Sequence, residues 1–331
     1  MGTLKITGVF FAALLVASTL TVEAQTQNKI PRVGFLRLTR QAEEPKLGRL
    51  EEFRQGLRQL GYIEGQNITL ELRWAEDKLV QVPIMMTELV RLNVDVIVTH
   101  GPTGVRAAKE ATNTIPVVIA RMDDADIAGF VASLARPAGN ITGLSFQTGE
   151  VSGKLLDLLK ESRPKISRVA VLSDKTGTVN QLKTLQNAAL SAGVQLQLAQ
   201  VQNVNDFPSS FEAMLKGNSE SLVILGSPLF TNNTKQLASL ATKHRIPGIY
   251  YNRRFAEDGG LMAYGPDESD PSWGYRRAAV YVDKILKGTK PADLPVEQPT
   301  RFEFVINLKA AKQIGVIVPP NVLARADSVI K

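Results

Sequence analysis

The chain has 331 residues, 44% of them hydrophobic and 21% charged, a composition typical of folded globular proteins and not of disordered chains. This length exceeds what one hydrophobic core usually organises, so two lobes are expected. The net charge of +7 comes from lysines and arginines that are mixed with acidic residues, and without a basic block or a zinc-ligand spacing it argues against nucleic-acid binding.

Residues 1–24 have the pattern of a secretory signal peptide. Lys5 supplies a positive charge, residues 6–20 are apolar and almost uncharged, and residues 22–24 (Val-Glu-Ala) form a small-x-small cleavage site. The apolar stretch is short for a membrane span of about 20 residues, although an uncleaved anchor is the alternative. The chain has no cysteine, so no thiol can carry a lipid anchor or form a disulfide. The sequence therefore predicts a periplasmic protein that is cleaved from its leader and diffuses freely.

The first half of the mature chain alternates strands and helices. Apolar runs predict strands at residues 32–38, 68–74, 94–98 and 117–120. Amphipathic periodicity predicts helices between them, at residues 47–60, 79–92 and 104–112. A turn at residues 99–103 is expected at the carboxyl edge of a parallel sheet, where open α/β folds bind small ligands. This order predicts a doubly wound lobe.

The second half repeats the alternation after an interruption. An acidic turn at residues 121–126 and a short helix at residues 127–134 break the pattern. Strands are then predicted at residues 141–146, 168–172, 194–201, 222–225 and 247–251, with helices at residues 151–162, 178–192, 206–216 and 231–244. The chain closes with a helix at 272–287, a strand at 302–307 and a helix at 308–314.

The predicted fold class is α/β, with two doubly wound parallel-sheet lobes joined by a three-crossing hinge. The crossings are expected at residues 141–146, at the glycine-rich residues 259–266 and at the proline-rich residues 291–299. The expected lobe limits are residues 25–143 with 264–297 for lobe 1, and residues 144–263 with 298–331 for lobe 2. A hinge of this kind lets two lobes close on a ligand.

Several long sequence segments resemble those of one protein family. They include FRQGLRQLGYIEGQNITLELRWAE, ELVRLNVDVIV, AAKEATNTIPVVIA, GFVASLARPAGNITGLS and RRAAVYVDKILKGTKPADLPVEQPTRFEFVINLKAAKQIG. The chain from about residue 30 to its end is similar to the ABC transporter substrate-binding proteins of type I periplasmic-binding fold, within the branch that binds aromatic amino acids such as tryptophan. The resemblance implies export, a closing two-lobed receptor, and delivery to a permease driven by an ATPase. Similar sequences have Asp-Pro after the fourth strand, whereas here Ala125 follows Asp124.

Loops after the strands supply the candidate ligand-binding residues, because the carboxyl edges of both sheets are expected to face one cleft. The candidates are Arg37, Thr39, His100, Gly101, Thr103, Arg121, Asp123, Asp124, Phe146, Asp174, Ser227, Tyr251, Asn252 and Tyr264.

Some of these candidates have a specific expected role. Gly101 and Thr103 lie at a helix start, whose free amides attract a carboxylate, although Thr103 can instead cap its own helix. Asp123 and Asp124 are candidate partners of a ligand ammonium group, or else solvated turn residues.

Arginine and aromatic residues complete the expected site. Arg37 and Arg121 can hold a carboxylate through two parallel hydrogen bonds, or can serve in surface ion pairs. The rings of Phe146, Tyr251, Phe255 and Tyr264 can enclose an aromatic or apolar ligand, or can pack within the hinge or core.

Competing function classes lack their characteristic residues. The two histidines, His100 and His244, lie on different predicted lobes and have no cysteine nearby, so neither a metal site nor a cofactor is predicted. GLSFQ at residues 143–147 lacks the last glycine of a nucleophile elbow, and the chain has no Walker loop and no GxGxxG after its first strand. A periplasmic hydrolase remains the enzymatic alternative. A repressor's sensory domain would need a helix-turn-helix where the leader lies.

The sequence therefore predicts a monomeric receptor that is not an enzyme. Its expected partners are a small-molecule ligand and an inner-membrane ABC permease with its ATPase, and no nucleic acid. An apolar or aromatic amino acid is the leading ligand class, with a small carboxylate or a nucleoside-like compound as alternatives. A chemoreceptor or a kinase is the alternative to the permease.

Overall fold

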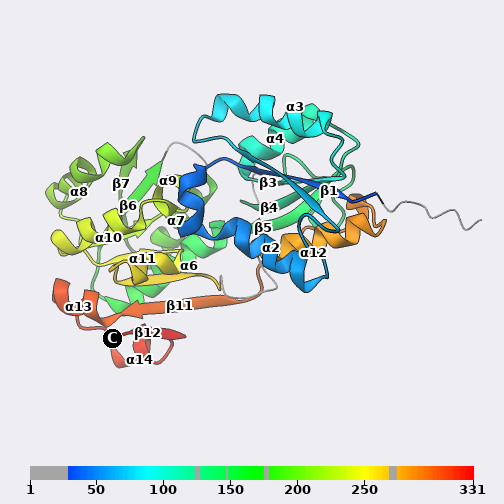
Figure 1. Cartoon of the computed structure of the whole chain (residues 1–331). Coiled ribbons are helices and arrows are strands. Elements are labelled where there is room, and N and C mark those ends of the chain that lie inside the picture. The colour runs from blue at the N-terminus through cyan, green and yellow to red at the C-terminus, as the bar shows by residue number, and fades with distance from the viewer. Residues whose placement is uncertain (1–28, 124–126, 147, 175–178, 268–273) are drawn as a thin grey trace, which may run out of the picture.

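The computed structural model describes residues 29–123, 127–146, 148–174, 179–267 and 274–331. The predicted signal peptide lies outside these ranges, and so do Asp124 and Ala125, the site where similar sequences have Asp-Pro. Within them the strands form two sheets, one of five strands and one of seven (Figure 1). We call the first sheet with its covering helices lobe 1, and the second sheet with its helices lobe 2. The predicted two-lobed α/β fold is confirmed.

The sheet of lobe 1 is entirely parallel. Its strands are β1 (Arg32–Arg37), β2 (Thr69–Trp74), β3 (Val96–His100), β4 (Val117–Asp123) and β5 (Ile141–Phe146), in the order β2-β1-β3-β4-β5. Parallel strands end at one common edge, and in Figure 1 this carboxyl edge of lobe 1 faces lobe 2. The candidate residues at the ends of these strands therefore lie at the boundary between the lobes.

Helices cover both faces of the first sheet. In Figure 1, α3 (Val82–Arg91) and α4 (Gly101–Ala111) lie on one face, and α2 (Arg49–Gln59) and α12 (Gly274–Leu286) on the other. Val96 and Val98 belong to the same core cluster as Phe53 of α2, whereas Ile97 belongs to the cluster of Met86 of α3. Burial on both faces explains why the sequence shows a continuous apolar run here. The shorter elements are η1 (Gln41–Glu43), α1 (Glu44–Leu47) and η2 (Leu79–Gln81).

The sheet of lobe 2 contains one antiparallel pair. Its strands are β6 (Arg168–Asp174), β7 (Gln195–Val201), β8 (Ser221–Ile224), β9 (Gly248–Tyr250), β10 (Met262–Pro266), β11 (Phe302–Asn307) and β12 (Ser328–Ile330), in the order β12-β11-β10-β9-β8-β6-β7. The pair β10 and β11 is antiparallel, because β10 leads the chain out toward lobe 1 and β11 brings it back. The other described pairings are parallel.

The helices of lobe 2 surround its sheet (Figure 1). They are α6 (Thr148–Ser162), α7 (Val179–Ala192), η3 (Val204–Asp206), α8 (Phe207–Lys216), α9 (Pro228–Thr231), α10 (Thr234–Lys243), α11 (Arg253–Glu257), α13 (Leu308–Ile314) and α14 (Pro320–Leu323). α6 packs against α7, while α10 packs against α8, α11 and α13. The end of the chain, including β12 and α14, has no counterpart among the predicted elements.

Segments that are far apart in the sequence meet where the chain passes between the lobes. β5 pairs within the first sheet and β10 within the second, while α12 packs against α2, β3, β4 and β5 of lobe 1. The segment after η4 (Pro291–Asp293) also contacts lobe 1, where Glu297 forms a β-bridge with Leu144. Arg277 of α12 holds the Glu297 carboxylate through two hydrogen bonds of 2.7 Å. This segment therefore follows lobe 1 before the chain returns to lobe 2.

Two predicted turns next to the site are wrong. β3 runs directly into α4, and Gly101, with φ of 66°, makes the change of direction within one residue where a turn at residues 99–103 was expected. β4 continues through residues 121–123, which were expected to begin an acidic turn, because Met122 pairs with Ser145 of β5. Arg121 is therefore held by a strand.

Two predicted helices also differ. Residues 128–134 form turns and bends instead of a helix, and Ser133 makes local hydrogen bonds of 3.0 and 3.2 Å with the backbone of Arg136. Such local bonds compete with helical ones. The helix predicted at residues 231–244 is interrupted between α9 and α10.

Candidate functional site

Arg37 is the centre of a buried polar group at the carboxyl edge of lobe 1. It is 3% exposed, and its Nη1 donates a hydrogen bond to the hydroxyl of Tyr275 at the start of α12. The same nitrogen lies 3.5 Å from Nδ1 of His100, and Nε lies 3.6 Å from the Glu44 carboxylate. The expected alternative, a surface ion pair for Arg37, is wrong because this guanidinium is enclosed.

The lowered pKa of His100 indicates a positive electrostatic potential at this edge. Burial lowers the pKa of its imidazole well below the usual value, and the charges of Arg37, Arg121 and Arg49 lower it further. The ring is therefore neutral at pH 7. Burial also raises the pKa of the neighbouring Tyr275 hydroxyl, an effect that the same arginines oppose. An environment that disfavours added positive charge favours an anionic group such as a carboxylate.

A second group joins the two lobes. The guanidinium carbon of Arg121, in β4, lies 4.5 Å from the centre of the Phe146 ring and 5.6 Å from that of Tyr251. Phe146 ends β5, and its ring meets Tyr251 edge-on with the centres 5.1 Å apart. Because Tyr251 follows β9, this contact brings the carboxyl ends of β5 and β9 together. The expectation that both sheets turn these ends toward one boundary is met at this point.

Tyr251 is anchored within lobe 2. Its hydroxyl lies 2.7 Å from Oγ1 of Thr231, which also lies 3.0 Å from the hydroxyl of Tyr250. The Tyr250 and Tyr251 rings pack edge-on, 4.5 Å apart, and burial raises the pKa of the Tyr250 hydroxyl well above the usual value. This support fixes the ring that Arg121 contacts.

Three other candidates of lobe 2 lie at the ends of its strands. Asp174 ends β6 and is 5% exposed. Asn252 caps α11 by accepting a hydrogen bond of 2.9 Å from the amide of Arg254, and Ser227 accepts one of 3.4 Å from the amide of Phe230. The last two side chains therefore support local structure. Sequence reasoning missed Gln181, whose amide bonds both the carbonyl and the amide of Gly226 beside Ser227, at 2.9 and 2.6 Å.

Tyr264 and Phe255 pack within lobe 2. Tyr264 lies in β10, and its ring stacks on Phe302 of β11 with the centres 5.7 Å apart. Phe255 is fully buried and meets Tyr250 edge-on. The four aromatic residues expected to enclose a ligand thus divide into a pair at the lobe boundary, Phe146 and Tyr251, and two packing residues.

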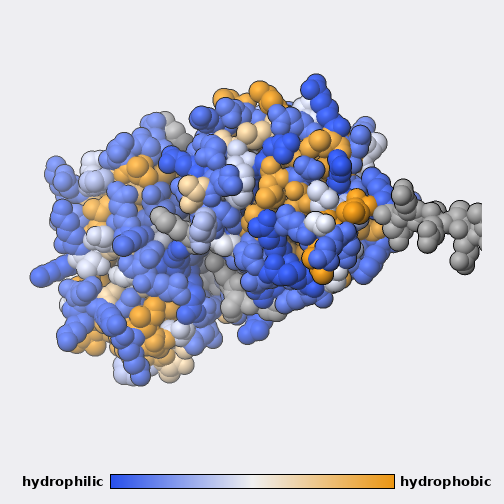
Figure 2. All heavy atoms as spheres, viewed as in Figure 1, coloured by the Kyte–Doolittle hydropathy of each residue, from blue (hydrophilic) through white to orange (hydrophobic). Residues whose placement is uncertain are grey.

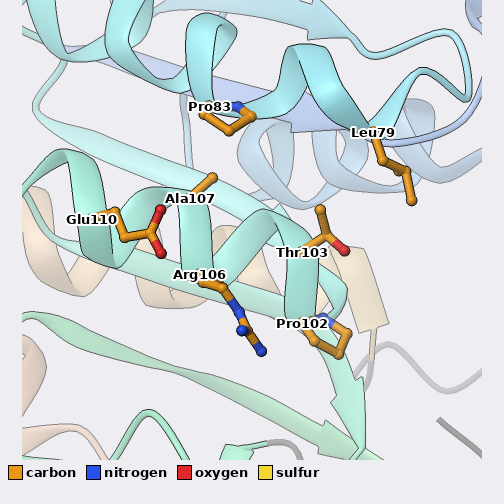
Figure 3. A pocket seen from close by; sticks show the side chains of 7 residues that line it. All are labelled: Leu79, Pro83, Pro102, Thr103, Arg106, Ala107 and Glu110. Carbon is orange, nitrogen blue, oxygen red and sulfur yellow. The ribbon is translucent and has the colours of Figure 1, made fainter. Parts of the chain in front are cut away.

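Thr103 lines a pocket of about 320 Å³ in lobe 1, between α4 and the segment formed by η2 and α3 (Figure 3). Its side chain extends from α4 toward the opposite wall, which Leu79 of η2 and Pro83 of α3 form. The N-cap of α4 is His100, so the alternative that Thr103 caps this helix is wrong. Val80 and Ile84, the sequence neighbours of Leu79 and Pro83, are 85% and 64% exposed, and Figure 2 shows hydrophobic atoms over this part of lobe 1.

The remaining candidates are placed only in part. Thr39 is 8% exposed and lies two residues after Arg37, the last residue of β1. Asp123 is the last residue of β4, but its side chain and all of Asp124 lie outside the described residues. Sequence reasoning missed Glu44 and Tyr275, because nothing in their local pattern indicates that they meet Arg37.

One parallel and one mainly parallel sheet, each covered by helices and meeting at a boundary that holds Arg37, Arg121 and an aromatic pair, have the architecture of a two-lobed periplasmic binding protein of type I. The sequence profile described as "ABC transporter substrate binding protein" matches residues 45–330. The chain belongs to the family of ABC transporter substrate-binding proteins, as the resemblance of its sequence segments predicted. This family consists of extracytoplasmic solute receptors.

Individual relatives agree with this assignment. A protein of Clostridioides difficile named tyrosine-binding protein is 24% identical over 276 residues, which are 82% of this chain and 78% of the relative. A conserved domain protein of Vibrio cholerae has a similar structure, with a TM-score of 0.78 and 26% identity over 91% of this chain and 100% of the other. A Streptococcus pneumoniae ABC domain in complex with L-Trp also has a TM-score of 0.78, with 24% identity over 90% of this chain and 100% of the other. Among the described helices, none combines the length and apolarity that a membrane crossing needs.

Proposed function

We propose that this protein is the receptor of an ABC importer and that it binds an aromatic amino acid between its lobes. It releases this ligand chemically unchanged to an inner-membrane permease with its ATPase. The proposal further includes cleavage of residues 1–24, residence in the periplasm as a monomer, and ligand contacts from Arg37, Arg121, Phe146 and Tyr251.

The single observation that carries this proposal is the meeting of Arg121 with the Phe146 and Tyr251 rings at the lobe boundary. A guanidinium that lies over two aromatic rings brings a positive charge, which attracts a carboxylate, and apolar area for an aromatic side chain to one place. The arginines that lower the pKa of His100 add positive potential on the same edge. The names of the Clostridioides and Streptococcus relatives, which mention tyrosine and L-Trp, support the same ligand class.

Calorimetry tests the ligand class. The mature protein is unfolded and refolded to remove any carried-over ligand, and is then titrated with L-tyrosine, L-tryptophan and L-phenylalanine, and with a nucleoside, a sugar and benzoate as controls. The expected result is saturable binding of one aromatic amino acid, with a dissociation constant in the micromolar range or below. Preference for one of the control compounds would refute this ligand class.

Two further measurements test the cellular role. Mass spectrometry of the periplasmic fraction should give a chain that begins at Gln25, and the incubated ligand should be recovered unchanged. Deleting the cognate permease should abolish uptake of the radiolabelled ligand. Normal uptake with loss of a chemotactic or transcriptional response would instead favour a sensory partner.

A further inference from the structure

Three buried polar atoms have hydrogen-bonding capacity that no described residue uses, and they belong to Arg37, to its ion-pair partner Glu44 and to Thr39, two residues after Arg37. They are Nε of Arg37, Oγ1 of Thr39 and Oε2 of Glu44, and their residues are 3%, 8% and 9% exposed. Leaving a buried polar group without a partner costs about 1–3 kcal/mol, and more for a charged one. Leaving such atoms on both members of one buried ion pair is therefore costly if the pair is purely structural.

The ion pair between Arg37 and Glu44 does not satisfy these atoms. Nε and Oε2 are 3.6 Å apart, a separation at which their charges attract without a good hydrogen bond. The other Glu44 oxygen, Oε1, accepts a hydrogen bond from the amide of Leu50 in the first turn of α2. The Glu44 carboxylate is thus held in place with one oxygen still able to accept, beside a guanidinium that can still donate.

The head group of a free amino acid complements this arrangement. Its carboxylate accepts hydrogen bonds and carries a negative charge, as Nε of Arg37 requires. Its ammonium group donates and carries a positive charge, as Oε2 of Glu44 requires. A carboxylate alone would satisfy Arg37 and would approach Glu44 with like charge.

We propose that Arg37 and Glu44 together bind the zwitterionic head group of the ligand. Arg37 binds the carboxylate, and Glu44 binds the ammonium group and thereby selects amino acids over other aromatic carboxylates. This inference rests on the proposed function and adds a selecting residue to it. The three atoms are covered, so the ligand reaches them when the segment 41–47 moves. Figure 1 shows this segment, in blue, at the end of lobe 1 that faces lobe 2. Gly48, with φ of 68°, joins it to α2.

The test compares two ligands on two proteins by calorimetry. The ligands are L-tyrosine and its des-amino analogue, 3-(4-hydroxyphenyl)propionate, and the proteins are the wild type and Glu44→Gln. The glutamine keeps a carbonyl oxygen for the Leu50 amide and removes the charge. The wild type should prefer L-tyrosine by roughly 10- to 100-fold, the value of one charge-assisted hydrogen bond. Glu44→Gln should lose this preference through weaker binding of L-tyrosine, with unchanged binding of the analogue.

The control is Glu51→Gln on the exposed side of α2, where Glu51 pairs with Arg58. It should leave both affinities unchanged. Tighter binding of L-tyrosine by Glu44→Gln would overturn the proposal, since Glu44 would then compete with the ligand carboxylate. Equal losses for both ligands, or no loss, would also overturn it. If the wild type bound neither aromatic amino acids nor their analogues, the proposed function itself would fail.

A measurement on the wild type keeps the proposal testable if Glu44→Gln does not fold. Hydrogen–deuterium exchange is followed at equal, saturating occupancy of L-tyrosine and of the analogue. L-tyrosine should slow exchange in residues 41–47 more than the analogue does, because only its ammonium group bonds Glu44. Equal protection by the two ligands would refute the assignment.

Discussion

The guanidinium of Arg121 in lobe 1 lies over the ring of Tyr251 in lobe 2, with 5.6 Å between its central carbon and the ring centre. Phe146 stands beside both, 4.5 Å from the guanidinium and 5.1 Å from the Tyr251 ring centre. This contact couples the carboxyl ends of β4 and β5 in lobe 1 to the end of β9 in lobe 2. It makes Arg121 a residue through which ligand binding and lobe closure can depend on each other.

Replacing Arg121 by glutamine should weaken binding of the aromatic amino acid by about 10-fold or more. The substitution removes a contact over an aromatic face worth about 0.5–2 kcal/mol and a positive charge that, in the proposed function, attracts the ligand carboxylate. Calorimetric titration measures the change. Lys109→Gln is the matched control, because Lys109 lies 5.6 Å from the ring centre of Phe130, away from the lobe boundary. Equal affinities for Arg121→Gln and the wild type would exclude Arg121 from ligand binding.

The Tyr251 ring and hydroxyl should make separable contributions. Tyr251→Phe removes the hydrogen bond to Thr231 and should cost about 1 kcal/mol of stability, with affinity within about threefold of the wild type. Tyr251→Ala also removes the ring and should weaken binding by at least about 10-fold. Tyr281→Phe loses a comparable hydrogen bond, to the Pro295 carbonyl, and should not change affinity. Strong ligand binding by Tyr251→Ala would contradict the proposed role of the ring.

The partly exposed His100 should make the protein sensitive to acid, because its imidazole lies among arginines. Its pKa in the folded state lies well below the value of about 6.5 expected in the unfolded chain. Below pH 6.5 the unfolded chain therefore binds a proton that the folded protein excludes, and His100 lowers the free energy of unfolding by up to about 1.4 kcal/mol per pH unit until the folded-state pKa is reached.

Urea denaturation at several pH values tests this expectation. His100→Gln should show a shallower loss of stability between pH 7 and pH 5 than the wild type. At pH 8 the titration of His100 contributes nothing, so a comparison there isolates the change in packing. Parallel pH profiles for the two proteins would show that His100 is not protected from protonation.

Gly265 should tolerate no side chain. A Cβ atom at this position would overlap the carbonyl oxygen of Tyr251, because β10 passes close to the end of β9. Gly265→Ala should therefore lower stability by about 3 kcal/mol and weaken ligand binding by displacing Tyr251. Gly153→Ala in α6 meets its nearest atom at an ordinary 3.6 Å and should be neutral or slightly stabilising. Thermal unfolding of both variants measures the difference.

Local sequence patterns were sufficient for most of the architecture. The run 94–98 predicted a strand buried on both faces, and β3 has this character, with Val96, Ile97 and Val98 fully buried. The alternation of apolar and polar residues is imposed by the sheet and helix repeats, so it survives in the sequence. The errors at residues 99–103 and 121–123 arose because a strand's end depends on pairing with its neighbour, which no local pattern encodes.

The sequence by itself determined the two-lobed class, the family, and the arginine and aromatic residues that end the strands of both sheets. Only the tertiary structure decided which of these residues meet. Tyr275 reaches Arg37 because α12 returns from lobe 2 to pack on α2, and Tyr251 reaches Arg121 because the ends of β9 and β5 converge. Contacts between segments distant in the chain depend on how whole layers of helices and strands pack. The local sequence therefore does not indicate which residues meet.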